Sequence, residues 1–172
     1  GVRQGGWGWG TSFLDYDNDG DLDLIMTNGQ IFEDNEADED EIFNHDPMRL
    51  WRNNGNGTFT EVSAAEGITD TRSGKGLLNF DYDRDGDLDV FVGTRVRPGA
   101  YPLSGSSQLL RNDKGSFTDV TSKVAKSLLS AGMVSSAVWS DANNDGWLDL
   151  FVLREWGAPL LLQNHNGTLT DT

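Results

Sequence analysis

The sequence contains no cysteine, and it is poor in positively charged residues. Its 172 residues include 13 Lys and Arg against 28 Asp and Glu, so the formal net charge at pH 7 is −15. Without cysteine the chain forms no disulfide, and an extracellular form needs another source of stability. Such an acidic surface disfavours nucleic acid as a partner and favours cations.

Long hydrophobic runs are also missing. Hydrophobic residues make up 36% of the chain, and no apolar stretch approaches the ~18 residues of a membrane span, so we expect no membrane insertion. The sequence begins without Met and without a signal peptide, from which we expect a processed or excised piece. Glycine, at 21 residues, and aromatic residues are frequent instead. This composition predicts many short strands joined by tight turns.

An aspartate-rich motif occurs three times, at intervals of roughly 60 residues. It reads DYDNDGDLD from Asp15, DYDRDGDLD from Asp81 and DANNDGWLD from Asp141. Each copy is followed by an apolar run and later by a segment such as LLRNDKGSFTDV, in which Asn-Gly or Lys-Gly separates two strand-like runs. These pairs are typical of β-hairpin turns. A repeat of this size with four strands predicts a propeller blade.

We therefore predict an all-β fold of three four-stranded antiparallel blades of a β-propeller, either a partial propeller or a subunit of an assembled one. The blades are expected at 1–70, 71–130 and 131–172, with an acidic insertion at 29–48 in the first. The apolar runs lack strict alternation, which indicates strands covered on both faces by neighbouring blades.

Individual elements follow from the same pattern. First strands are expected at 7–14, 76–80 and 135–140, and second strands at 22–27, 88–93 and 148–153. Short helical turns are expected at 64–66 and 123–131.

The three aspartate motifs indicate calcium-binding loops. Asp at motif positions 1, 3 and 5 places carboxylates around one point, and Gly at position 6 permits the positive φ that turns the chain around it. The carbonyl of position 7 and the carboxylate of position 9 complete an oxygen-only shell, which selects Ca²⁺ over transition metals. We therefore predict three Ca²⁺ sites. Their residues are Asp15, Asp17, Asp19, Asp21 and Asp23; Asp81, Asp83, Asp85, Asp87 and Asp89; and Asp141, Asn143, Asp145, Trp147 and Asp149.

The three sites are not expected to be equal. Asn143 stands where the other loops have a carboxylate at position 3, so the third loop should bind calcium more weakly. Side chains at position 7 are expected to matter little, because the backbone carbonyl would be the ligand there.

Other interpretations of the motif fit less well. A single copy would fit a glycine-rich turn with solvated carboxylates, but three copies in the same register favour calcium. An EF-hand needs a Glu at position 12 and flanking helices, whereas position 12 is Met26, Val92 or Val152 and the flanks are strand-like. A dockerin-like pair of loops fails for the same lack of helices.

The Asp-x-Asp-x-Asp-Gly-x-x-Asp loop, the strand before it and the Leu-x-Arg-Asn-x-Gly-x-Phe-Thr-x-Val hairpin resemble FG-GAP/VCBS repeats, the calcium-bearing blades of integrin α-chain propellers. The resemblance covers nearly the whole chain. It implies an extracellular protein, secreted or at the cell surface, whose aspartate loops bind calcium on one face. Partners would engage the opposite face, through the connections 29–48, 94–107 and 154–159. Candidate partner residues there are Arg95, Arg97, Tyr101 and Trp156.

Catalysis has little support in the sequence. The chain has two histidines, His45 and His165, and no cysteine, and no nucleophile–base constellation is recognisable. We therefore predict a protein that is not an enzyme. Asn56 and Asn166 begin Asn-Gly-Thr sequons in equivalent turns and are candidate glycosylation sites, although Asn-Gly is also ordinary hairpin chemistry. The acidic stretch 33–41 is either a solvated loop or a docking surface for a basic partner or extra calcium.

Together these features predict an extracellular calcium-binding module for adhesion to a protein or a cell surface. Two alternatives stay open. One is a structural subunit whose blades stack between chains into a ring or filament; the other is a propeller that binds glycans. Members of the resembling family close rings of more blades than the three found here, so we expect self-association or a place in a longer propeller.

Overall fold

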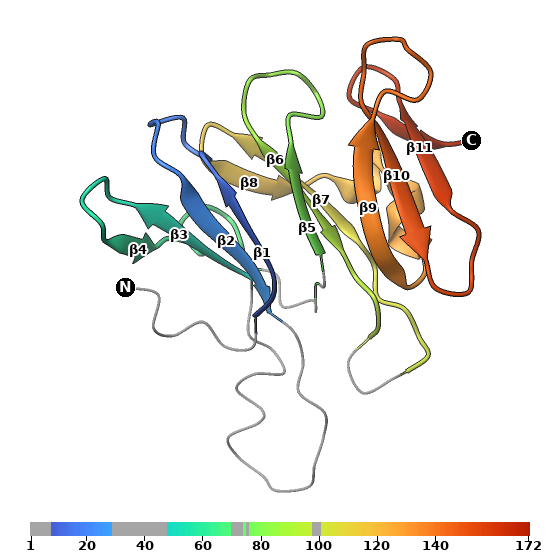
Figure 1. The fold of residues 1–172 in the computed structure, drawn as a ribbon, viewed down its shortest axis with the longest axis horizontal. Coiled ribbons are helices and arrows are strands. Elements are labelled where there is room, and N and C mark those ends of the chain that lie inside the picture. Colours follow the sequence, from blue (N-terminus) through green and yellow to red (C-terminus); the bar gives the residue numbers. More distant parts are fainter. Residues whose placement is uncertain (1–7, 29–47, 70–73, 75, 98–100) are drawn as a thin grey trace, which may run out of the picture.

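The computed structural model describes residues 8–28, 48–69, 74, 76–97 and 101–172. This part of the chain forms three four-stranded sheets with very little helix (Figure 1). None of its helices combines the length and the apolar character that crossing a membrane requires.

Each sheet is one blade, in which every strand pairs antiparallel with the next in sequence. Blade 1 contains β1 (Gly8–Leu14), β2 (Asp23–Asn28), β3 (Arg49–Asn53) and β4 (Phe59–Glu61). Blade 2 contains β5 (Gly76–Phe80), β6 (Asp89–Gly93), β7 (Gln108–Asp113) and β8 (Ser116–Asp119). Blade 3 contains β9 (Val134–Ser140), β10 (Asp149–Arg154), β11 (Leu160–Asn164) and β12 (Leu169–Asp171). The predicted all-β fold of three four-stranded blades is confirmed, and the first and second strands lie within one residue of their expected bounds.

The connection between blades 2 and 3 is partly helical. It contains α2 (Thr121–Val124) and a 3₁₀ helix, η1 (Lys126–Ser130), as expected for 123–131. The segment 64–66 lies in a short hydrogen-bonded turn, as expected, in which the Glu66 N–H donates to the carbonyl of Val62, four residues earlier, at 3.0 Å.

The blades pack face to face, with an apolar cluster in each of the two interfaces. In β6, Val90 and Val92 belong to the cluster shared with blade 1, whereas Phe91 belongs to the cluster shared with blade 3. Successive side chains of a strand point to opposite faces, so both faces of a strand in the middle blade are covered by neighbouring blades. All five residues of β6 are accordingly buried. The prediction of strands covered on both faces is confirmed for this blade.

The two ends of the blades carry different connections. The aspartate loops, between the first and second strands, and the hairpin turns, between the third and fourth strands, lie at the upper end of each blade in Figure 1. The connections from β6 to β7 and from β10 to β11 reach the opposite end. The structure therefore separates the aspartate loops from the described parts of the connections 94–107 and 154–159, whereas the third expected partner connection, 29–48, falls outside the described residues except for Met48.

Candidate metal centres in the aspartate loops

The three aspartate loops share one backbone arrangement. The carboxylate at position 1 accepts hydrogen bonds from the backbone N–H groups of positions 5 and 6, as Asp15 does from Asp19 at 3.1 Å and from Gly20 at 3.0 Å. Asp81 and Asp141 do the same in the other loops. The residue at position 4 has a positive φ in each loop, as does the Gly at position 6. The glycine requirement was predicted, whereas the left-handed residue at position 4 was not.

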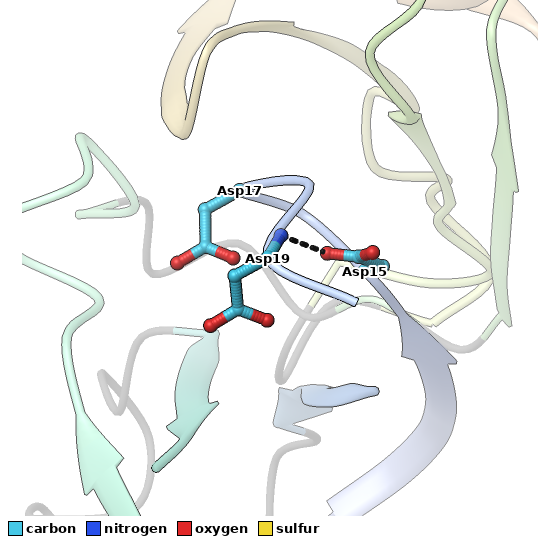
Figure 2. A group of neighbouring side chains, drawn as sticks. All are labelled: Asp15, Asp17 and Asp19. Carbon is cyan, nitrogen blue, oxygen red and sulfur yellow. Dashed lines mark hydrogen bonds between the residues drawn. The ribbon is translucent and has the colours of Figure 1, made fainter. Parts of the chain in front are cut away.

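Carboxylates converge in the first two loops. One carboxylate oxygen from each of Asp15, Asp17 and Asp19 lies within 4.8 Å of the other two. Figure 2 shows the side chains of Asp17 and Asp19 projecting to the same side of the loop, while Asp15 accepts the backbone hydrogen bond from Asp19. In the second loop the converging groups are Asp81, Asp83 and Asp89.

The position-3 carboxylates supply an observation that fits a cation. Asp17 Oδ1 and Asp83 Oδ1 are buried, and neither accepts a hydrogen bond. A buried acceptor without a donor costs about 1–3 kcal/mol, and more when it is charged. A bound cation would remove this cost, and a set of carboxylate oxygens is the donor set that Ca²⁺ prefers. The residues of the first two loops therefore fit calcium.

The electrostatics of these loops point the same way. Burial raises the pKa of the Asp17 carboxyl above its usual value, and the neighbouring charge of Asp19 raises it further. Burial and the charge of Asp85 raise the pKa of Asp83 in the same manner. Both carboxylates are thus ionised at a cost, which a nearby positive charge would offset.

The third loop is arranged differently. The Asn143 side-chain amide donates to Asp145 Oδ2 at 2.9 Å, and its Oδ1 accepts the Asp145 N–H at 3.0 Å. Hydrogen bonds from Trp147 N–H and from Asn143 lower the pKa of Asp145. In the described residues, no group of three acidic or metal-ligating side chains converges in this loop. The predicted third site therefore has a weaker structural basis than the other two.

Position 9 has a structural role that the sequence did not reveal. Asp89 is 1% exposed, and its two oxygens accept hydrogen bonds from the backbone N–H groups of Tyr82 at 3.0 Å and Asn112 at 2.8 Å. Asp23 and Asp149 make the equivalent pairs of bonds. Burial nevertheless dominates and raises the pKa of Asp89 to about 7. Each position-9 carboxylate joins the aspartate loop to the third strand, and lone pairs left on its oxygens are available to a cation.

The expectation that side chains at position 7 matter little does not fit Asp87. This side chain is 8% exposed. Its Oδ1 accepts a hydrogen bond from the Asn18 side chain of blade 1 at 2.7 Å, and its Oδ2 accepts one from the Lys114 N–H at 2.8 Å. Asp87 therefore links two blades, because the neighbouring loop lies beside it. Asp21, at the same position of blade 1, accepts no side-chain hydrogen bond within the described residues.

One asparagine in the hairpin of blade 2 and one in the hairpin of blade 3 also connect the blades. The Asn112 side chain donates to the carbonyl of Tyr16 in the loop of blade 1, and Asn164 donates to the carbonyl of Tyr82 in the loop of blade 2, both at 2.8 Å. This Asn recurs in all three hairpin segments of the sequence. Its recurrence suggested only a hairpin turn and gave no indication of a contact between blades.

The predicted partner residues lie at the opposite end of the blades, where Arg97, Tyr101 and Trp156 are exposed and Arg95 is half-buried. Trp156 is 76% exposed and Tyr101 62% exposed, and their rings meet edge to face with centroids 5.9 Å apart. The Arg95 guanidinium forms a two-fold ion pair with Glu155, in which Nη2 and Oε2 are 3.0 Å apart. Arg97 is exposed and donates its backbone N–H to Leu103 at 2.7 Å. The connections of blades 2 and 3 thus meet in one aromatic patch, formed by Tyr101 and Trp156.

The remaining predicted residues lie apart from these sites. Asn56 and Asn166 are exposed in their hairpin turns, and Asn56 Oδ1 accepts a hydrogen bond from the Thr58 hydroxyl at 2.6 Å. His165 is exposed in a hairpin turn, whereas His45 and the acidic stretch 33–41 fall outside the described residues.

A cavity of about 320 Å³ lies between blades 1 and 2, lined by Met48, Ile68, Gln108, Leu110 and Asp119 among others. Its one lining carboxylate, Asp119, accepts hydrogen bonds from the N–H and the hydroxyl of Thr121. The cavity lining thus offers a carboxylate already engaged with the backbone and no base–nucleophile pair.

The comparison with known proteins agrees with the repeated architecture. The profile of the FG-GAP-like repeat family matches residues 42–92 and 81–152. Cartilage acidic protein 1 of Mus musculus is 30% identical over 129 residues, which are 74% of this chain and 18% of that protein. The Homo sapiens protein of the same name is also 30% identical over 129 residues, 74% of this chain and 17% of that protein. The Xenopus tropicalis protein is 28% identical over 106 residues, 61% of this chain and 15% of that protein.

This chain spans less than a fifth of the length of these curated relatives. The family match nevertheless extends over more than half of the chain and includes parts of all three sheets and the second and third aspartate loops. The chain therefore belongs to the FG-GAP-like repeat family.

Proposed function

We propose that this chain is an extracellular calcium-binding module that adheres to a protein or a cell surface and has no catalytic role. The observation that carries the calcium part is the pair of buried, unpartnered oxygens, Asp17 Oδ1 and Asp83 Oδ1, inside clusters of carboxylates. FG-GAP-like repeats and the similarity to cartilage acidic protein 1 support the extracellular assignment.

Calcium would hold each loop closed from within. In the first two loops the position-3 carboxylate would face the ion, while the position-1 and position-9 carboxylates keep the backbone in place and contribute lone pairs. Extracellular modules bind calcium with Kd of roughly 10⁻⁴–10⁻³ M. Occupancy would therefore be high only where calcium is millimolar, as it is outside cells.

The aromatic patch is our candidate for the adhesive surface. Tyr101 and Trp156 are of the types that dominate binding hot spots, and the Arg95–Glu155 pair would fix the two connections that carry them. A protein surface is the proposed partner. Two exposed aromatic rings also suit sugar rings, so glycan binding stays an alternative. A structural subunit that assembles by blade stacking is the other alternative.

Calorimetric titration with Ca²⁺ tests the metal assignment. We expect two stronger sites and one weaker site in the wild-type chain, and the loss of one stronger site in Asp83→Asn. Asp171→Asn is the matched control, since this exposed carboxylate lies in β12. Absence of binding at millimolar Ca²⁺, or an equal loss in the control, would contradict the calcium assignment.

A binding assay tests the surface separately. Wild-type chain in calcium would be applied to immobilised matrix proteins, to cells and to a glycan array, beside the variant Tyr101→Ala/Trp156→Ala. We expect the double variant to lose binding while it keeps its calcium affinity. Leu129→Ala, which removes another exposed apolar side chain, is the control. Binding that survives the double substitution would contradict this surface, and binding confined to glycans would favour the glycan alternative.

A further inference from the structure

The aromatic patch lies among positive charges, although the chain as a whole is strongly acidic. The described parts of the two connections that form it, 94–97 with 101–107 and 154–159, contain three arginines and one glutamate, namely Arg95, Arg97, Arg154 and Glu155. The formal net charge of these parts is therefore +2, whereas that of the chain is −15. The aspartate loops lie at the other end of the blades (Figure 1). A local positive charge of this kind attracts negatively charged groups and orients them as they approach.

Two of the three arginines are already used within the protein. Arg95 forms the two-fold ion pair with Glu155 that joins the two connections. Arg154 donates its Nε–H to the carbonyl of Ala158 at 2.8 Å. Arg97 is exposed, and in the part of the chain that the structure describes its side chain makes no hydrogen bond or ion pair. The guanidinium of Arg97 is therefore available to a partner.

Arg97 shares its connection with one of the two aromatic rings. The backbone hydrogen bond from the Arg97 N–H to the carbonyl of Leu103, 2.7 Å long, closes a short segment that includes Tyr101. Leu103 is 57% exposed and Tyr101 is 62% exposed, and the Tyr101 ring contacts that of Trp156. This surface thus offers a partner one guanidinium, one aliphatic side chain and two aromatic rings.

Trp156 is an unusual residue for its backbone conformation. Its φ is 59°, in the left-handed region where a bulky side chain is strained and where Gly or Asn fits more easily. The side chain is 76% exposed, so burial does not offset this strain. Strained residues cluster at binding sites, and rigid aromatic side chains lose little conformational entropy when a partner covers them. Contact with a partner therefore explains Trp156 better than folding does.

The composition of this surface distinguishes between two classes of acidic partner. A sulfated glycan is a dense polyanion, and such polymers bind to clusters of several Lys and Arg side chains. Here one arginine is free, and the negative charge of the rest of the chain would repel a polyanion. A protein segment that carries one or two carboxylates beside apolar side chains matches the surface better. Trp, Tyr and Arg are also the residue types that dominate hot spots in protein interfaces.

We propose that the aromatic patch binds an extended acidic segment of another protein. In this complex an Asp or Glu side chain of the partner pairs with Arg97, and a neighbouring apolar side chain packs against Tyr101 and Trp156. The Arg95–Glu155 ion pair holds the two connections together before the partner arrives, which lowers the cost of ordering them on binding. The inference rests on the proposed function, because it names the partner chemistry of the same surface.

Selection from a displayed library of random linear peptides tests this chemistry. The wild-type chain in millimolar calcium is expected to enrich peptides in which Asp or Glu stands beside an apolar residue. Arg97→Glu should reverse the preference, so that Lys and Arg are enriched instead. For one selected acidic peptide, Arg97→Gln should weaken binding by about threefold and Arg97→Glu by about tenfold or more, because the first loses an exposed ion pair and the second adds repulsion.

Lys123→Glu is the matched control, since it changes the net charge by the same amount at an exposed lysine of α2. It should keep the preference for acidic peptides and the wild-type affinity. Raised salt should weaken the binding of the acidic peptide more in the wild type than in Arg97→Gln, because salt screens exposed charges. Circular dichroism establishes that each variant folds. A wild-type selection without acidic residues, or an equal effect of Lys123→Glu, would overturn the proposal.

The outcomes separate this inference from the proposed function. Enriched peptides that lack acidic residues, but no longer bind Tyr101→Ala/Trp156→Ala, would overturn the acidic partner and leave the adhesive patch in place. Acidic peptides that still bind this double variant would contradict the patch itself. Absence of any enriched peptide would overturn the proposed protein segment. Heparin retention that Arg97→Glu abolishes would then assign the surface to a sulfated glycan.

Discussion

The second and third aspartate loops have the same backbone arrangement and share five of their nine residues, yet they satisfy their polar groups differently. In the second loop Asp83 Oδ1 is buried without a donor. In the third loop the amide of Asn143 donates to Asp145, and its oxygen accepts from the Asp145 N–H. At position 3 the difference is one side-chain NH₂ in place of an oxygen, and positions 2, 4 and 7 differ as well. The NH₂ group gives Asp145 of the third loop a hydrogen-bond donor inside the protein, whereas Asp83 Oδ1 of the second loop has none.

The comparison separates two roles of the carboxylates, which are to support the loop backbone and to bind a cation. Positions 1 and 9 hold the backbone in all three loops, since they accept the same N–H groups whether position 3 is Asp or Asn. In the first two loops the Oδ1 atoms of Asp17 and Asp83 accept no hydrogen bond within the protein, although each carboxyl also interacts with the backbone N–H of position 5. The need for a cation is therefore greatest at position 3, and it can be tested apart from the backbone role of positions 1 and 9.

Removal of calcium is expected to have the largest effect. A site with a Kd of roughly 10⁻⁴ M is occupied at about 100 times its Kd in about 10 mM calcium and then contributes about 2.7 kcal/mol to the free energy of unfolding, and the first two loops should each contribute. Thermal unfolding followed in millimolar calcium and in chelator should show a clearly lower midpoint in chelator. Coincident melting curves would contradict the comparison, because they would mean that the first two loops need a cation no more than the third loop does.

Loss of a position-9 carboxylate should be next in size. Asp89→Ala leaves the buried N–H groups of Tyr82 and Asn112 without acceptors, at a cost of at least about 2 kcal/mol. Asp149→Ala should destabilise by a similar amount, because its bonds are the same. Denaturant unfolding in chelator measures both variants without any contribution from the metal. If either variant were destabilised in calcium alone, position 9 would be a ligand only and its structural role would be refuted.

The position-7 carboxylates should differ from each other. Asp87→Ala loses the link to Asn18 and to the Lys114 N–H, and we expect it to cost about 1 kcal/mol of stability. Asp21→Ala should leave the stability of the dilute monomeric chain within about 0.5 kcal/mol, as expected for a surface site away from such contacts. Chemical unfolding in calcium compares the two. Equal effects would show that the bond between blades contributes nothing.

Much of this architecture could be predicted from the sequence, because the repeat itself sets strand positions. Three copies aligned by their aspartate loops placed the first and second strands to within one residue. The bonds between blades could not be predicted in this way. Asp87 and Asn112 act on residues of another blade, roughly a full repeat away, and only packing brings them there. Sequence reasoning therefore assigned Asp87 to a free side chain and Asn112 to turn chemistry.

The smallest expected effect is that of Asp83→Asn. It is the most specific test of the comparison, because its change in stability should have opposite signs with and without calcium. Asp83→Asn should weaken calcium binding of the second loop by about tenfold or more, because affinity follows ligand charge. In chelator the same variant should be slightly more stable than the wild type. Burial and Asp85 raise the pKa of Asp83, so removing its charge relieves a cost that is present at neutral pH, where the carboxyl is ionised in the unfolded chain.

The reverse substitution, Asn143→Asp, should lower stability in chelator and strengthen calcium binding by the third loop. Melting curves of both variants with and without calcium measure the four effects. Variants that shift in the same direction in both conditions would mean that position 3 serves the backbone, and that the two loops do not differ in their need for an ion.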